Sequence, residues 1–137
     1  MSLPNLTTIG SGAGGFDNVF TGMTNLSAVN LPSLSVVGEN GMMREFQNCT
    51  NLTAISLPAM TNISGMYSFM YAFNGCTKLE HVAMQNLTAI GVGGAQYAFN
   101  GCTSLKTVDF AKVSTFGQQG VDYMFKGCTS LQIVNFS

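Results

Sequence analysis

Phenylalanine recurs along this chain at a nearly constant spacing of about 26 residues, a period typical of stacked repeats. The positions are Phe20, Phe46, Phe73, Phe99 and Phe125, and only the second interval is longer, by a single residue. Each opens the same phrase, F-x-[GN]-[CM]-T-x-L-x-x-[VI]-x-[LMF], and a second apolar phrase such as LPSLSVVG or MQNLTAIG follows it. A unit of this length cannot bury its own apolar side chains, whereas stacked copies can. The repeat therefore predicts a solenoid.

Stacking would align equivalent residues of successive copies in ladders through one shared core. The alternation in L-x-x-[VI]-x-L predicts a short strand in each copy, and neighbouring copies would pair in a parallel sheet. The second phrase is a candidate for another short strand. Gly38, Gly91 and Gly117 follow it and predict turns at which a positive φ costs glycine little. Residues 93–100 have the length for one helical turn.

The phrases NGCTSLKTVDF and KGCTSLQIVNF, with the L-x-x-I-G that follows, resemble the BspA-like subclass of bacterial leucine-rich repeats. The run from Met124 to Leu131 is similar to the related surface-protein repeat M-F-x-x-C-x-x-L. The resemblance implies a leucine-rich-repeat-type, right-handed superhelix of mainly β or α/β class. About five 26-residue rungs would carry a parallel sheet on one face and short turns or helical turns on the other. It also implies a surface-exposed protein linked to adhesion and to protein or matrix binding.

Charge and hydropathy exclude several partners. Only 8% of the residues are charged, the formal net charge is −1, and the five Lys and Arg residues do not cluster. The chain therefore lacks the basic footprint that nucleic acid or anionic lipid requires. No apolar run approaches the roughly 18 residues of a membrane helix, and the N-terminus does not resemble a signal peptide. We expect no nucleic-acid partner and no membrane insertion.

One cysteine occurs at the same position in each of four copies, and Met23 takes that position in the first. The positions are Cys49, Cys76, Cys102 and Cys128. Stacked neighbours would come close to disulfide range, but the register places this position in the core. We favour buried free thiols over disulfides, and we expect Met23 to be a buried equivalent.

No catalytic, metal or cofactor site is expected. Gly10–Gly15 matches G-x-G-x-x-G, but the segment is the variable loop of the repeat and lacks the βαβ context of a dinucleotide site. His81 is the only histidine and is predicted at an outward strand position, while Cys76 would point into the core. The cysteines also lack the two-to-four-residue spacing of zinc ligands. The chain is interpreted as a non-enzyme.

Two further columns are expected beside the core. A threonine recurs after each cysteine position, where its hydroxyl would bond to the backbone at the turn into the strand. Tyr71, Tyr97 and Tyr123 each precede a repeated Phe by two residues and align with Arg44 and Asn18. Packing at the edge of the core is the favoured reading of these tyrosines, and a platform for a sugar or peptide is the alternative.

Outward positions of the predicted strands form the candidate binding surface, since exposed repeat faces are the usual binding surfaces of solenoids. The candidate residues are Asn30, Ala54, Ser56, His81, Ala83, Thr107 and Asp109. They are small and nearly uncharged, which suits a flat protein surface or a glycan. We expect a host or cell-surface protein or glycan as partner, and the alternative is a structural spacer or fibre segment with no specific ligand.

Residues 1–137 are expected to form a single repeat domain. Neither end carries a polar capping repeat, so we expect a segment of a longer array, with end-to-end association of isolated copies as a second expectation. The resemblance implies location at the cell surface or secretion, although this segment shows no signal peptide. The function predicted from the sequence is thus non-catalytic adhesion or binding.

Overall fold

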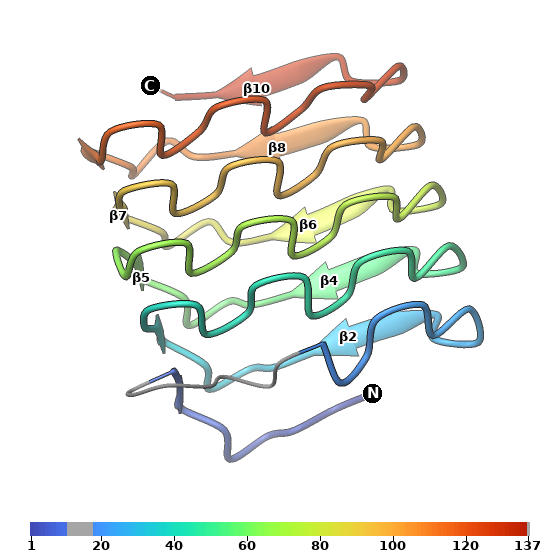
Figure 1. Cartoon of the computed structure of the whole chain (residues 1–137), viewed down its shortest axis with the longest axis horizontal. Coiled ribbons are helices and arrows are strands. Elements are labelled where there is room, and N and C mark those ends of the chain that lie inside the picture. The colour runs from blue at the N-terminus through green and yellow to red at the C-terminus, as the bar shows by residue number, and fades with distance from the viewer. Residues whose placement is uncertain (11–17, 137) are drawn as a thin grey trace.

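The computed structural model describes residues 1–10 and 18–136, which coil into successive rungs stacked along one axis (Figure 1). Two parallel five-stranded sheets run the length of the stack. The first sheet contains β2 (Ala28–Asn30), β4 (Ala54–Ser56), β6 (His81–Ala83), β8 (Thr107–Asp109) and β10 (Ile133–Asn135). The second contains β1 (Thr8–Ile9), β3 (Val36–Val37), β5 (Asn62–Ile63), β7 (Ala89–Ile90) and β9 (Thr115–Phe116). The predicted solenoid of short parallel strands is confirmed.

A third side of the stack, here called the turn wall, consists of residues 40–49, 67–76, 93–102 and 119–128. Backbone N–H groups on this wall alternate between two kinds of acceptor. Phe99 donates to the carbonyl of Met124 in the next rung at 3.0 Å, whereas Gln96 donates to Gly93 within its own rung at 3.2 Å. The result is the wavy trace that lies in front of the first sheet in Figure 1.

The turn wall corrects the expectation of a helical turn at residues 93–100. A helix would direct the backbone groups along the segment itself, but Ala95 donates instead to Gly120 of the next rung at 2.8 Å. The bonds that remain inside a rung close consecutive four-residue turns. No part of the described chain is helical, so the fold is β rather than α/β.

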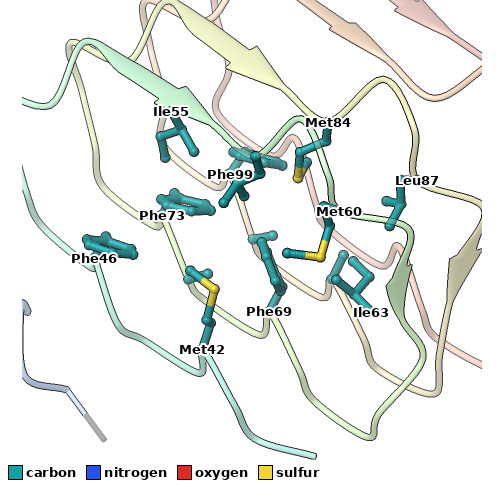
Figure 2. Close-up of a cluster of buried hydrophobic side chains, with 14 of the residues drawn as sticks. Met42, Phe46, Ile55, Met60, Ile63, Phe69, Phe73, Met84, Leu87 and Phe99 are labelled. Atoms are coloured by element: carbon teal, nitrogen blue, oxygen red, sulfur yellow. The ribbon is translucent and has the colours of Figure 1, made fainter. Parts of the chain in front are cut away.

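The repeated phenylalanines lie in single file through the core. Successive ring centroids are 5.4, 5.4, 5.5 and 5.9 Å apart, and the ring planes differ by 8° or less. Figure 2 shows Phe46, Phe73 and Phe99 in this file, with Met42, Phe69 and Met60 filling the space between it and the second sheet. Phe46, Phe73 and Phe99 are at most 1% exposed. The single file of rings that the spacing predicts is confirmed.

Burial declines toward both ends of the described stack. Phe20 and Phe125 are only partly buried, and Phe136, whose ring stacks on the buried Phe110, is 50% exposed. The expectation of a buried Met23 is also wrong, since this side chain is 46% exposed. The ladders are therefore continuous, but several of their members become exposed in the end rungs.

The glycines that follow strands of the second sheet are required for a different reason from the one predicted. Gly38, Gly91 and Gly117 do not have a positive φ. Instead, their α-carbons pass against the backbone of a neighbouring rung: a Cβ at Gly91 would collide with the carbonyl of Ser64, and one at Gly38 with the carbonyl of Gly10. Close approach between rungs, not turn conformation, selects glycine at these corners.

Three of the five repeated threonines bond as predicted. The hydroxyl groups of Thr77, Thr103 and Thr129 donate to the carbonyls of Thr50, Thr77 and Thr103 at 3.5, 3.1 and 3.4 Å, one rung back in each case. Each hydroxyl thus satisfies a backbone acceptor in the turn that leads to the first sheet.

Truncation of a buried ring inside the file should cost much more stability than truncation of an exposed ring in the end rung. We expect Phe99→Ala to lower the free energy of unfolding by about 3–5 kcal/mol, since it leaves a cavity between two stacked rings. Phe136→Ala is the matched control and should cost about 1 kcal/mol, because half of its ring is already exposed. Chemical denaturation measures both; similar losses for the two variants would contradict the assignment of the core.

A methyl group at a corner glycine should be more damaging than one at a glycine with positive φ. Gly91→Ala forces a side chain into the backbone of Ser64, whereas Gly101, at φ 74°, has no neighbour closer than 3.7 Å to an added Cβ. We expect Gly91→Ala to cost about 3 kcal/mol or more and Gly101→Ala about 1 kcal/mol. Thermal denaturation of the pair would show the reverse order if conformation, rather than rung contact, selected Gly91.

Candidate binding surface

The strand register brings all the sequence-predicted binding residues onto one face of the first sheet. Cα pairing aligns Ala54 with His81 and His81 with Thr107. A parallel column aligns Asn30 with Ser56 and Ser56 with Ala83. The two columns are Ala28, Ala54, His81, Thr107 and Ile133, and Asn30, Ser56, Ala83, Asp109 and Asn135. We call this surface the first-sheet face.

Small side chains occupy the middle of the first-sheet face. Ala54, Ser56 and Ala83 on β4 and β6 are half-buried, whereas the larger His81, Thr107 and Asp109 are exposed. Residues that end at Cβ or Oγ leave the backbone of β4 and β6 close to any surface that docks there. The face is consequently shallow and weakly polar, and it lacks the enclosed shape of a small-molecule site.

Charged groups lie mainly at the edge of the face and are engaged with one another. The ammonium of Lys106 donates to Glu80 Oε2 at 2.9 Å, and His81 Nε2 lies 3.9 Å from the same oxygen. The Lys106 contact holds the pKa of Glu80 below its usual value. Asp109 Oδ1 accepts bonds from the backbone N–H of Ala111 at 3.0 Å and from Asn135 Nδ2 at 3.2 Å. The Lys106–Glu80 pair cancels in charge, and Asp109 is the one carboxylate in the two columns of the face.

The tyrosine column lies on the turn wall, away from the first-sheet face. The rings of Tyr71 and Tyr97 stack at 4.9 Å, and those of Tyr97 and Tyr123 at 4.8 Å. Arg44 continues the column, with its guanidinium carbon 5.6 Å from the centroid of Tyr71. The rings pack on one another, and Tyr123 at the end of the column is 57% exposed. Because each ring covers the face of its neighbour, flat stacking of a sugar on the faces of the inner rings is blocked.

A BspA-type leucine-rich repeat model matches residues 2–132, in six copies. The chain belongs to the BspA-type leucine-rich repeat family. The span includes the apolar segment 3–10 ahead of the first repeated Phe. This family is typically surface-associated, its members are generally non-catalytic, and leucine-rich repeat modules generally bind proteins.

A solved structure of similar fold supports the architecture. It is described as a T. pallidum leucine-rich repeat protein, and it is 23% identical to this chain with a TM-score of 0.62. The match covers 99% of this chain and 68% of the other. At this identity the likeness shows the fold. Comparison with curated protein sequences gave no match.

The cysteine of the BspA-type repeat bonds across rungs. Each Sγ lies 3.0–3.2 Å from the carbonyl oxygen of the Phe that opens the preceding copy, as Cys76 does with Phe46 and Cys102 with Phe73. All four cysteines are free thiols, and three are fully buried. Burial raises the pKa of Cys76 to about 12 and also raises the pKa of Cys102. The position is thus a structural one, in line with the favoured reading.

The catalytic and metal sites considered in the sequence analysis are not assembled among the described residues. His81 is exposed on the first-sheet face, whereas Cys76 points into the core, so they do not form a dyad. Among residues 1–10 and 18–136 no group of three or more His, Cys, Asp or Glu side chains is placed to hold a metal ion. Within the same residues, no helix of the length and apolarity of a membrane span occurs. Positions 11–15 of the G-x-G-x-x-G segment lie outside the described residues.

Two features of the repeat were not predicted from the sequence. Glu45 is fully buried in a column that Ala72 and Ala98 occupy in later rungs. The aligned phrases carry the signal, since the residue before the repeated Phe is apolar in the other copies. The tyrosine column has a positive φ, for instance 55° at Tyr97, and no pattern of polarity indicates a left-handed backbone at an aromatic residue.

Thiol labelling should follow burial. The thiolate is the reactive form, so a raised pKa keeps Cys76 and Cys102 protonated and unreactive at neutral pH. We expect iodoacetamide to modify the half-buried Cys128 first in the native protein, and Cys76 and Cys102 only after denaturation. Peptide mass spectrometry gives the order; equal native rates for Cys76 and Cys128 would contradict the buried ladder.

Proposed function

We propose that this chain is a non-catalytic adhesion module that binds an extracellular or host-cell protein through the first-sheet face. The observation that supports this most directly is the register, which gathers every sequence-predicted binding residue on one exposed surface. Family membership adds that such modules generally bind proteins. Because the family is typically surface-associated, the proposal includes a location at the bacterial cell surface.

The chemistry of the face favours a protein over a small ligand. The half-buried Ala54 and Ala83 permit close approach of a flat partner, while His81 and Thr107 supply hydrogen-bonding groups beside them. The scarcity of unpaired charge disfavours long-range steering of a charged partner. A glycan on this face remains the alternative partner of the same proposal.

A rigid spacer is the second candidate function. Backbone hydrogen bonds join each described rung to the next on all three sides, which suits a rod that holds another domain at a distance. Membership in a longer array stays a prediction, as does end-to-end association of isolated copies. The exposed apolar side chains of Phe116, Ile133 and Phe136 at one end of the stack support end-to-end association.

A charge-neutral double variant tests the first-sheet face. Ala54→Glu with Ala83→Lys places two long charged side chains in the middle of the face and leaves the net charge unchanged. On arrays of matrix proteins, host-cell proteins and glycans, we expect the native chain to give at least one saturable protein ligand. The double variant should weaken that binding at least about tenfold, since it desolvates charges at the contact.

Ala111→Lys is the matched control, because Ala111 is exposed in the turn that leaves β8 and lies off the face. It should bind like the native chain. Retained binding by a folded double variant would contradict the proposed surface, and silence of the native chain on broad arrays would favour the spacer.

A further inference from the structure

The turn wall keeps bulky aromatic residues where its own backbone favours glycine. Tyr71, Tyr97 and Tyr123 have φ values of 58°, 55° and 53°. Four residues further on, the next column with positive φ is filled by the residues that tolerate it best, Asn48, Gly75, Gly101 and Gly127. Ring stacking at 4.8–4.9 Å offsets part of the strain. Tyrosine at this column is therefore a costly choice, and strain of this kind is often kept at functional positions.

The column presents ring edges and hydroxyl groups rather than ring faces. Each inner ring is covered on both sides, Tyr71 by Arg44 and Tyr97, and Tyr97 by Tyr71 and Tyr123. Within the described part of the chain, none of the three hydroxyl groups has a hydrogen-bond partner. The stack thus carries a line of phenol groups, each able to donate and to accept one bond, at the spacing of the rungs.

A second polar column lies beside the first. Asn74 and Asn100 close four-residue turns on Tyr71 and Tyr97, with N–H to carbonyl distances of 3.1 Å in both. In the last rung the residue three positions on, Lys126, reaches the ring of Tyr123 at 5.7 Å, which shows that the two columns are neighbours. Gln47 Nε2 donates to Asn74 Oδ1 at 3.2 Å, so in this column the carboxamides of two successive rungs are in contact. Phenol and amide groups form parallel lines along the stack axis.

We propose that these two columns bind a neutral, linear polysaccharide that lies along the stack axis. Sugar hydroxyls both donate and accept, as phenol and carboxamide groups do, and a repeating polymer meets the same pair of groups at every rung. Contacts that are weak singly then add along the chain. This site goes beyond the proposed function, since it lies on a different side of the stack and needs no protein partner.

Two other kinds of polymer fit the wall poorly. An added peptide strand needs free backbone groups, but the N–H groups of Tyr71 and Tyr97 already donate to Gln96 and Asp122 of the next rungs at 3.0 Å. Single-stranded nucleic acid needs open aromatic faces and a basic groove, whereas the inner ring faces are covered and the chain has a net charge of −1.

Isothermal titration calorimetry of the intact chain with defined oligosaccharides tests the proposal. The probes are cellohexaose, chitohexaose and laminarihexaose, each with its disaccharide. We expect at least one hexasaccharide to bind, at least about tenfold more tightly than its disaccharide, because it spans several rungs. Absence of binding by all three hexasaccharides at millimolar concentration would overturn the proposal, as would equal affinity for the disaccharide.

Substitutions that keep the ring stack assign the site. Tyr97→Phe removes one hydroxyl and should weaken hexasaccharide binding about fivefold, the effect of one lost hydrogen bond. Tyr67→Phe is the matched control: Tyr67 also has a positive φ, but its ring lies over Gly93 outside the column, so binding should not change. Equal affinities of Tyr97→Phe and the native chain, at matching melting temperatures, would overturn the assignment.

The outcome can be separated from that of the proposed function. The double variant Ala54→Glu with Ala83→Lys should bind the hexasaccharide like the native chain, and Tyr97→Phe should bind any protein ligand like the native chain. Loss of hexasaccharide binding in the double variant, with binding retained in Tyr97→Phe, would place the glycan on the first-sheet face and overturn the second site.

Discussion

Register between rungs is the constraint on which the rest of the structure depends. Every rung must return its chain to the same positions, because the strands of both sheets and alternate N–H groups of the turn wall bond to neighbouring rungs. The rung from β5 to β7, which is one residue longer than the next, shows how strictly this holds. Val36 pairs with Asn62, but Asn62 pairs with Ala89, which lies one position further along the chain than the regular repeat would place it. The additional residue is accommodated at the corner after β5, where Ser64 N–H bonds to Asn62 Oδ1 at 2.6 Å, and both flanking walls keep their partners.

Fixed register explains why side chains recur as well as backbone. A residue type that recurs at the same position in each rung contacts an identical residue in the neighbouring rung. A favourable contact between identical side chains is therefore repeated along the stack. Flat rings stack, as Phe73 does on Phe99, and a hydroxyl such as that of Thr103 reaches the carbonyl of the rung before it. The cysteine follows the same logic: it is small enough for the core and its thiol still donates toward a backbone carbonyl. Repetition in the sequence is thus a direct consequence of hydrogen bonding between rungs.

The sequence predicted whatever depends on period and polarity. The regular spacing of the phenylalanines predicted the stack, and alternation around Val29, Ile55 and Val108 predicted the first sheet and its outward residues. The turn wall was beyond such reasoning, because its form depends on backbone conformation. Nothing in the letters around Tyr97 indicates a left-handed φ or a bond to the next rung. Gly91 was predicted as a turn glycine for the same reason: the sequence indicates that a Cβ is excluded there, but not that the backbone of Ser64 excludes it.

The two surfaces differ in what the stack contributes to them. On the first-sheet face, outward side chains vary from rung to rung, as Ala54, His81 and Thr107 do. A partner bound there therefore contacts a different set of side chains at each rung. On the turn wall the outward tyrosines are the same in three successive rungs, so a partner meets one group repeated along the axis. A varied surface can discriminate among folded proteins, whereas a uniform one offers equivalent contacts to a repeating polymer and gains affinity with polymer length. A solenoid can carry both, because its sides are built independently on one core.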